Sequence, residues 1–212
     1  MREIKTFYVN PLRECLYVLS AENGECVIVD PGCQTARERA RVDEYIAQES
    51  LRPVAILLTH GHFDHVLSLG CFAAEYDIPV VMNAADAELL SKLQQYTNTF
   101  AMEFNPTDKA EYRYVIDGVE ISYAGFTFKV IGTPGHTRGG VCYLEEKEKI
   151  LFSGDTLFEG SIGRTDLEDS DEDDMFASLE KLKRLDPEIS VYPGHGYPTT
   201  IGTELKFNPY LR

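Results

Sequence analysis

The feature of this sequence that most constrains its fold is the placement of its five histidines. All of them lie in three short glycine-flanked segments, and each segment follows an apolar run of strand length. Neutral imidazole is the commonest metal ligand in proteins. Open α/β sheets place their sites just beyond the carboxyl ends of their strands. We therefore expect an α/β fold with a metal centre just beyond the carboxyl ends of its strands.

Four strands are expected to lead into the candidate metal ligands. Only a few residues separate the end of each strand from the ligand that follows it, so the connecting loops should be short and stiff. Glycines in these loops, at positions 61, 132, 135, 154, 194 and 196, should let the backbone turn sharply. The expected pairs are His60 after the strand ending at Leu58, His136 after 126–131, Asp155 after 150–152 and His195 after 189–192.

The remaining segments alternate between strand and helix patterns. Strands 14–20 and 25–30 should form a hairpin through Ala-Glu-Asn-Gly. A helix over 35–50 should bury Ala36, Ala40, Val42 and Ile46. Further strands are expected over 54–58, 79–82, 115–121 and 140–145, further helices over 64–76, 84–96 and 173–184, and a long loop over 97–111.

The acidic run 166–174 has a structural and a functional interpretation. Ser170 and Asp173 could cap the helix that follows, and carboxylates suit the positive end of a helix. The alternative, a cation-binding role, is the weaker one. Because no repeat or linker is visible, we expect residues 1–212 to form a single domain.

Composition excludes several classes of function. Apolar and charged contents of 43% and 26% are ordinary for a globular protein. A net charge of −15 disfavours nucleic acid and anionic membranes as partners. No apolar stretch approaches the ~20 residues that span a bilayer, and no signal peptide is visible. The five cysteines have no paired spacing, which favours a reducing compartment, so the expected location is cytoplasmic.

The spacing within the first segment suggests two metals rather than one. His60 and His62 are two residues apart, so an extended backbone points both side chains to one side. Asp64 and His65 lie on the turn into a helix and should point elsewhere. Two-metal hydrolases hold their ions ~3.5–4 Å apart, and Asp155 is the natural bridging carboxylate.

These residues match a known family. His60-x-His62-x-Asp64-His65, followed by His136, Asp155 and His195, resembles the ligand set of the metallo-β-lactamase superfamily, in order and in separation. The resemblance implies a four-layer αβ/βα sandwich with the metals at one sheet edge. It assigns His60, His62 and His136 to one metal, and Asp64, His65 and His195 to the other. Asp155 would bridge both.

The resemblance also implies a reaction. A hydroxide held between two cations is a nucleophile at neutral pH, and the cations polarise the scissile carbonyl. Asp64 and Asp155 are the carboxylates expected to take part. Two divalent ions are expected, with zinc favoured and iron or manganese as alternatives. Because the loaded site would carry a small positive charge, a small anionic substrate fits it despite the acidic protein.

Within the superfamily the chain is most similar to glyoxalase II and to the persulfide dioxygenases. The segments 153–158 and 163–166 carry this similarity. Arg164 is a candidate contact for a substrate carboxylate, with an ion pair to Asp166 as the alternative. Tyr197 is a second candidate contact, with a core position as the alternative.

Two features depart from glyoxalase II. Gly61 stands where that enzyme usually has histidine, and only seventeen residues follow His195 instead of a helical glutathione-binding domain. The chain resembles instead a short bacterial subgroup of hydroxyacylglutathione hydrolase-like proteins. Substrate contacts could then come from a flap over 97–114, which carries Phe100, Met102 and Phe104. The alternative is ordinary packing onto the preceding helix.

The expected function is hydrolysis of hydroxyacylglutathione-type thioesters. The alternative enzyme is a mononuclear iron dioxygenase acting on persulfides, which would use only His60, His136 and Asp155. A third hypothesis is a metal or scaffold protein without catalysis, which the intact ligand set disfavours. The sequence does not indicate an oligomeric state.

Overall fold

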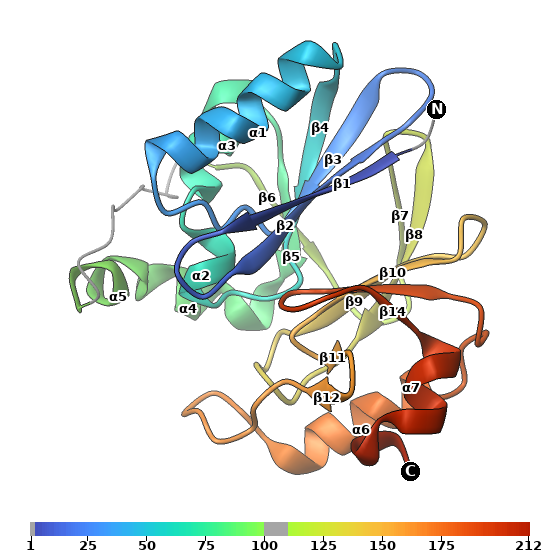
Figure 1. Cartoon of the computed structure of the whole chain (residues 1–212). Coiled ribbons are helices and arrows are strands. Elements are labelled where there is room, and N and C mark those ends of the chain that lie inside the picture. The colour runs from blue at the N-terminus through green and yellow to red at the C-terminus, as the bar shows by residue number, and fades with distance from the viewer. Residues whose placement is uncertain (1–2, 100–109) are drawn as a thin grey trace.

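The computed structural model describes residues 3–99 and 110–212. Two mixed six-stranded sheets pack face to face, and helices cover the outer face of each (Figure 1). This arrangement is the four-layer αβ/βα sandwich of the metallo-β-lactamase fold, as expected. No helix within the described ranges combines the length and the apolar character needed to cross a membrane.

The first sheet contains the N-terminal strands in sequence order. The pairs β1–β2 and β2–β3 are antiparallel, and the strands from β3 to β6 run parallel to one another. The strands are β1 (Glu3–Val9), β2 (Glu14–Ser20), β3 (Glu25–Val29), β4 (Arg52–Leu57), β5 (Val80–Asn83) and β6 (Tyr112–Val115).

The second sheet has the order β14-β13-β10-β9-β8-β7, with one parallel pair, β10–β13. Its strands are β7 (Glu120–Tyr123), β8 (Phe126–Gly132), β9 (Val141–Glu145), β10 (Ile150–Gly154), β13 (Ser190–Pro193) and β14 (Thr199–Thr200). A small separate hairpin joins β11 (Leu157–Phe158) to β12 (Ser161–Ile162).

Seven α-helices and two short 3₁₀ turns lie in the described ranges. Five of the helices precede residue 100 and lie on the side of the first sheet, and the last two lie beyond the second sheet (Figure 1). They are α1 (Ala36–Gln48), α2 (Phe63–Val66), α3 (Leu69–Tyr76), α4 (Ala87–Ser91), α5 (Leu93–Thr99), α6 (Glu172–Leu182) and α7 (Ile201–Phe207), with η1 (Ala84–Asp86) and η2 (Pro209–Leu211).

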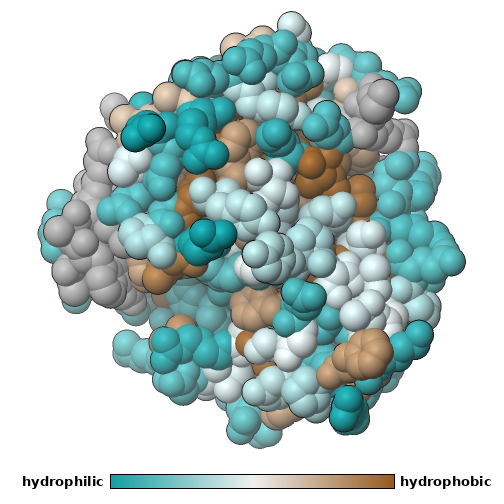
Figure 2. All heavy atoms as spheres, in the orientation of Figure 1, coloured by the Kyte–Doolittle hydropathy of each residue, from teal (hydrophilic) through white to brown (hydrophobic). Residues whose placement is uncertain are grey.

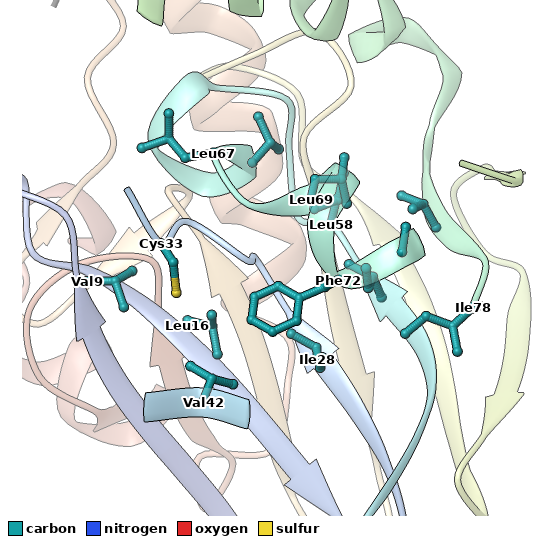
Figure 3. Close-up of a cluster of buried hydrophobic side chains, with 14 of the residues drawn as sticks. Val9, Leu16, Ile28, Cys33, Val42, Leu58, Leu67, Leu69, Phe72 and Ile78 are labelled. Carbon is teal, nitrogen blue, oxygen red and sulfur yellow. The ribbon is translucent and has the colours of Figure 1, made fainter. Parts of the chain in front are cut away.

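Three apolar clusters hold these layers together. One lies between the first sheet and its helices, where Phe72 contributes a fully buried ring (Figure 3). The second fills the space between the sheets around Tyr17 and Phe128, and the third packs α6 and α7 onto the second sheet. Figure 2 shows a mostly hydrophilic surface on the face of Figure 1, which agrees with the charged composition.

Helix α1 confirms part of the sequence prediction. Thr35 caps it and accepts a hydrogen bond from the Glu38 amide, and Val42 and Ile46 are buried as expected. Ala36 and Ala40 are exposed, contrary to expectation. Small alanines contribute little apolar area, so their spacing did not define the buried face.

The predicted strand 115–121 is wrong. Tyr112–Val115 belongs to the first sheet and Glu120–Tyr123 to the second, so the chain crosses between sheets there. Gly118 makes the turn with a φ of +83°, and Asp117 accepts a hydrogen bond from the Gly132 amide at 2.8 Å. The predicted helices 64–76 and 84–96 are each divided into shorter helices.

The predicted cap of helix α6 is also wrong. Asp171, not Ser170, is the N-cap residue and accepts from the Asp174 amide at 2.9 Å. The Ser170 hydroxyl donates instead to the carbonyl of His136 at 3.1 Å. Asp171 therefore caps the helix in place of Ser170, and Ser170 instead contacts the loop that carries the candidate ligand His136.

Candidate metal centre

The strand ends bring the predicted ligands together at one edge of both sheets. His60 lies just beyond β4 in the first sheet, and Asp64 and His65 belong to α2 immediately after it. His136, Asp155 and His195 follow β8, β10 and β13 of the second sheet. Each of these candidate ligands therefore follows the strand after which it was predicted.

Three groups of three possible donor residues form in the described part of the chain, and within each group the ligand atoms lie within 4.8 Å of one another. One of them combines Asp30 with His60 and His65, and the other two contain only predicted ligands. His60, His62 and His136 make the first triplet, in which His62 Nδ1 and His136 Nε2 are 2.9 Å apart. Asp64, His65 and His195 make the second, in which His195 Nε2 lies 3.2 Å from Asp64 Oδ2. These are the two sets that the family resemblance implies.

Asp155 lies between the two triplets. Its Oδ2 is 3.4 Å from His136 Nε2, and its Oδ1 is 3.5 Å from His65 Nε2. Gly154 turns the chain before it with a φ of +49°, where an added Cβ would stand 2.3 Å from the Thr59 hydroxyl. Its Oδ2 also lies 3.7 Å from His195 Nε2, so the carboxylate is within 4 Å of donors from both triplets, as a bridging ligand must be.

The backbone turns at only some of the expected glycines. Gly135, Gly154 and Gly196 have positive φ angles. Gly61, Gly132 and Gly194 do not, and they instead allow neighbouring groups to approach closely. A Cβ on Gly194 would stand 2.2 Å from Asp155 Oδ1, so this position has no room for a side chain.

In four of the five imidazoles, the Nδ1 nitrogen has a hydrogen-bond partner that orients the ring. His136 Nδ1 donates to the Arg164 carbonyl at 2.9 Å, and His195 Nδ1 donates to the Leu12 carbonyl at 3.1 Å. His65 Nδ1 lies 3.1 Å from Asp30 Oδ2, and His60 Nδ1 lies 3.1 Å from the Thr59 hydroxyl. Such partners hold each ring in place through Nδ1, so that Nε2 is the nitrogen left to bind a metal ion when the imidazole is neutral.

Asp30 supports both triplets and was not found from the sequence. It follows β3 with a φ of +49° and accepts from the Thr59 amide at 2.8 Å and the Thr59 hydroxyl at 2.6 Å. Through Thr59 it orients His60, and directly it orients His65. The signal available was its place at a strand end, the same place that the ligands occupy.

The donor atoms fit a metal centre. His60 Nε2, His65 Nε2 and Asp155 Oδ1 are buried and have no hydrogen-bond partner among the described residues. An unpaired buried polar atom costs ~1–3 kcal/mol. Coordination of divalent ions would remove that cost, because imidazole nitrogens and carboxylate oxygens are the donors that zinc and iron accept. Both Glu14 carboxylate oxygens are also buried without a hydrogen-bond partner among the described residues, and Oε1 lies 3.9 Å from His65 Nδ1. This side chain is a further residue that the sequence did not suggest.

Burial and neighbouring charges divide the histidines into two kinds. Burial, together with the charge of nearby His136, lowers the pKa of His62 to about 3, and burial lowers the pKa of His60 well below its usual value. Burial also acts to lower the pKa of His65, but Asp155 and other carboxylates outweigh it and raise that pKa to about 10. In the metal-free protein His60 and His62 therefore favour the neutral form, whereas His65 favours the protonated form.

A cavity of about 620 Å³ opens above these residues, within the range of small-molecule sites. Its wall contains Leu12, His62, Phe63, Asp64, His136, Asp155, Arg164, Leu167, Glu168, Asp169 and His195. Five of the seven candidate ligands thus line a cavity large enough for an organic substrate.

The two predicted substrate contacts differ in their surroundings. Arg164 lines the cavity, and its guanidinium donates to both Asp166 oxygens, at 2.7 and 2.9 Å, which is the ion pair named as the alternative. Tyr197 is 64% exposed, so the core position is wrong for it, and it is not part of the cavity wall. The segment 97–114 is described only over 97–99 and 110–114; Phe100, Met102 and Phe104 lie outside the described residues.

Comparison with known proteins agrees with the fold. The profile of the metallo-beta-lactamase superfamily matches residues 12–195. The chain is 33% identical to the probable metallo-hydrolase YqgX of Bacillus subtilis (strain 168), covering 96% of this chain and 94% of that protein. It is 33% identical to hydroxyacylglutathione hydrolase GloC of Haemophilus influenzae, covering 87% and 86%.

Solved structures show the same similarity. BLEG-1, a B3 metallo-beta-lactamase, is 35% identical with a TM-score of 0.89, and each chain is covered to 99%. TTHA1623, solved in a di-iron-bound form, is 34% identical with a TM-score of 0.85 over 98% and 100% of the two chains. The chain therefore belongs to the metallo-beta-lactamase superfamily of metal-dependent hydrolases.

Proposed function

We propose that this protein hydrolyses small thioesters of the hydroxyacylglutathione type at a centre of two divalent metal ions. The observation that carries the proposal is the convergence of two donor triplets, with unpaired buried nitrogens, beneath one cavity. The similarity to GloC over most of both chains supports the choice of substrate class. Zinc is the favoured metal, and the similarity to a di-iron-bound protein keeps iron as the alternative.

The chain's own residues have distinct parts in this proposal. His60, His62 and His136 would hold one ion, Asp64, His65 and His195 the other, and Asp155 would bridge them. When bound, such ions supply a water of lowered pKa and polarise the substrate carbonyl. Asp30, Thr59 and the carbonyls of Leu12 and Arg164 keep the imidazoles in the orientation that binding requires.

The cavity wall would select the substrate. Leu12, Phe63 and Leu167 offer apolar contact to an acyl group. Arg164 is the proposed contact for a substrate carboxylate, in competition with Asp166. Glu168 and Asp169 also line the cavity and would repel additional substrate carboxylates. The charge of the thiol carrier is therefore a variable that an experiment should include.

The test uses purified protein loaded with zinc or with iron, with the metal content measured in the same sample. Lactoylglutathione, a lactoyl thioester of N-acetylcysteamine and a chromogenic cephalosporin are supplied in parallel, and thiol release or ring opening is followed. We expect thiol release from a thioester, abolished in Asp155→Asn and retained in Asp117→Asn, whose carboxylate lies in the turn before β7. Hydrolysis of the cephalosporin alone would refute the thioesterase proposal.

A second candidate is the mononuclear iron dioxygenase acting on persulfides. His60, His136 and Asp155 give the two-histidine, one-carboxylate set that suits oxygen activation. In the structure His136 Nε2 lies 3.4 Å from Asp155 Oδ2, close enough for both to share one ion. One iron per chain together with oxygen consumption on glutathione persulfide would favour this function over hydrolysis.

A further inference from the structure

Asp86 is a buried carboxylate outside both donor triplets that contacts two of the ligand loops. It ends η1, directly after β5, and is 1% exposed. Its Oδ2 accepts hydrogen bonds from the Gly61 amide at 2.9 Å and from the Thr137 hydroxyl at 2.8 Å. Its Oδ1 accepts from the Gly139 amide at 2.6 Å. One side chain thus receives three donors from two separate loops.

The two loops come from different sheets. Gly61 lies between His60 and His62, beyond β4 of the first sheet, and Thr137 follows His136, beyond β8 of the second. The first triplet is made from these two loops alone. Its geometry therefore depends on how far apart the loops are held, and Asp86 accepts hydrogen bonds from both.

Glycines allow this close approach. An added Cβ on Gly139 would stand 2.6 Å from Asp86 Oδ1, and one on Gly61 would stand 2.9 Å from the Asp86 carbonyl oxygen. Neither glycine has a positive φ, so backbone conformation does not explain their presence. Each instead leaves the space that Asp86 and its backbone fill.

We propose that Asp86 is a positioning residue that sets the separation of the His60–His62 loop and the His136 loop, and so the metal affinity of the first triplet. The second triplet has other supports, namely Asp30 and the Leu12 carbonyl. Replacing Asp86 should therefore lower the affinity for the metal ion of the first triplet and leave the affinity for the other ion unchanged. This inference rests on the two-ion centre of the proposed function.

The metal-free protein offers the first test. In Asp86→Asn, an amide nitrogen replaces one acceptor oxygen, so at least one backbone donor loses its partner. Hydrogen exchange of the Gly61 amide, the Gly139 amide or both should therefore be faster in the apo variant than in the apo wild-type protein. The matched control is Glu145→Gln, another buried carboxylate, whose Oε2 accepts from the Glu148 amide at 2.6 Å away from the ligand loops. The control should leave both glycine amides protected.

The second test is titration of the apo protein with Co²⁺, followed by its visible absorption. Asp86→Asn should weaken one of two equivalents by ~10–100-fold, as loss of an outer partner of metal ligands does. The weakening should persist in an Asp64→Asn background, which lacks a second-triplet ligand, and disappear in a His62→Ala background. If Asp86→Asn does not fold, Thr137→Val removes a single donor and should give a smaller shift in the same equivalent.

Wild-type affinity for both equivalents in Asp86→Asn would overturn the inference, and so would equal weakening of both, which would indicate a general structural role. Neither measurement involves hydrolysis. A wild-type protein that binds two Co²⁺ ions but releases no thiol from any thioester would refute the proposed substrate class and leave the role of Asp86 intact.

Discussion

Replacing Gly194 by alanine tests the geometry of the metal centre without removing any donor atom. The new Cβ would stand 2.2 Å from Asp155 Oδ1 and 2.6 Å from His65 Cε1, whereas ordinary contacts begin near 3.4 Å. The carboxylate and the imidazole would therefore have to move by about 1.2 Å and 0.8 Å. Either displacement would change the distances between these two groups and the other candidate ligands.

Displacements of this size have a known cost. A misplacement of ~1 Å at a reacting centre lowers activity by about 100-fold, and overpacking costs ~1–3 kcal/mol of stability. We expect Gly194→Ala to lose metal from the second triplet and the bridge, to lower kcat/KM by about 100-fold, and to lower the melting temperature by several degrees. Metal content by mass spectrometry, thiol release and calorimetry measure the three effects.

Gly196→Ala is the matched control in the same loop. Gly196 has a φ of +87°, and a Cβ there meets nothing within 4 Å. The substitution should cost ~1–2 kcal/mol from the left-handed backbone alone and should leave the metal content unchanged. If Gly194→Ala retained full metal content and wild-type turnover, or if both variants behaved alike, the reasoning from the close contact would be wrong.

Three further predictions follow from the site. Because the pKa of His65 is raised to about 10, that residue is protonated at neutral pH, and metal binding to the second triplet should release its proton. Metal binding to the first triplet should release no proton from His62, whose pKa is lowered to about 3. Calorimetric titration in buffers of different ionisation enthalpy measures the number of protons released in each case. Asp30→Asn should weaken binding of both metal ions by ~10–100-fold, because the Asp30 carboxylate orients His65 directly and His60 through Thr59. A metal titration in which only one of the two equivalents binds more weakly would contradict this. Asp166→Ala should free the Arg164 guanidinium and lower KM for carboxylate-bearing thioesters more than for neutral ones, and an equal change for both would remove Arg164 from substrate recognition.

The candidate metal centre was largely predictable from the sequence, for a physical reason. Apolar runs identify strands, and ligands directly after them share an edge when the strands do. His60, His136, Asp155 and His195 were placed by that argument alone. The four-layer arrangement came from the family resemblance, because periodicity does not reveal which sheet a strand joins. The segment 115–121 shows this limit: its two halves belong to different sheets.

Supporting residues were much less predictable. Asp86 and Asp30 act through hydrogen bonds to residues distant in sequence, and a single carboxylate carries no local pattern of such contacts. Strand β1 was missed because it is mostly exposed or half-buried, without a continuous apolar run. Glu14 was read as an ordinary strand residue and is fully buried. The single-domain organisation of residues 1–212 stays a prediction.

The hydrogen bond from His195 to the Leu12 carbonyl has a consequence for biosynthesis. It joins residues 183 positions apart, and the donors of the second triplet come from both halves of the chain. A growing polypeptide that has already folded its first sheet still lacks His195 and Asp155. In the proposed two-ion centre, the second ion would lack its full set of ligands until residue 195 has been synthesised and has folded against the first sheet, so complete coordination there would follow folding of both sheets.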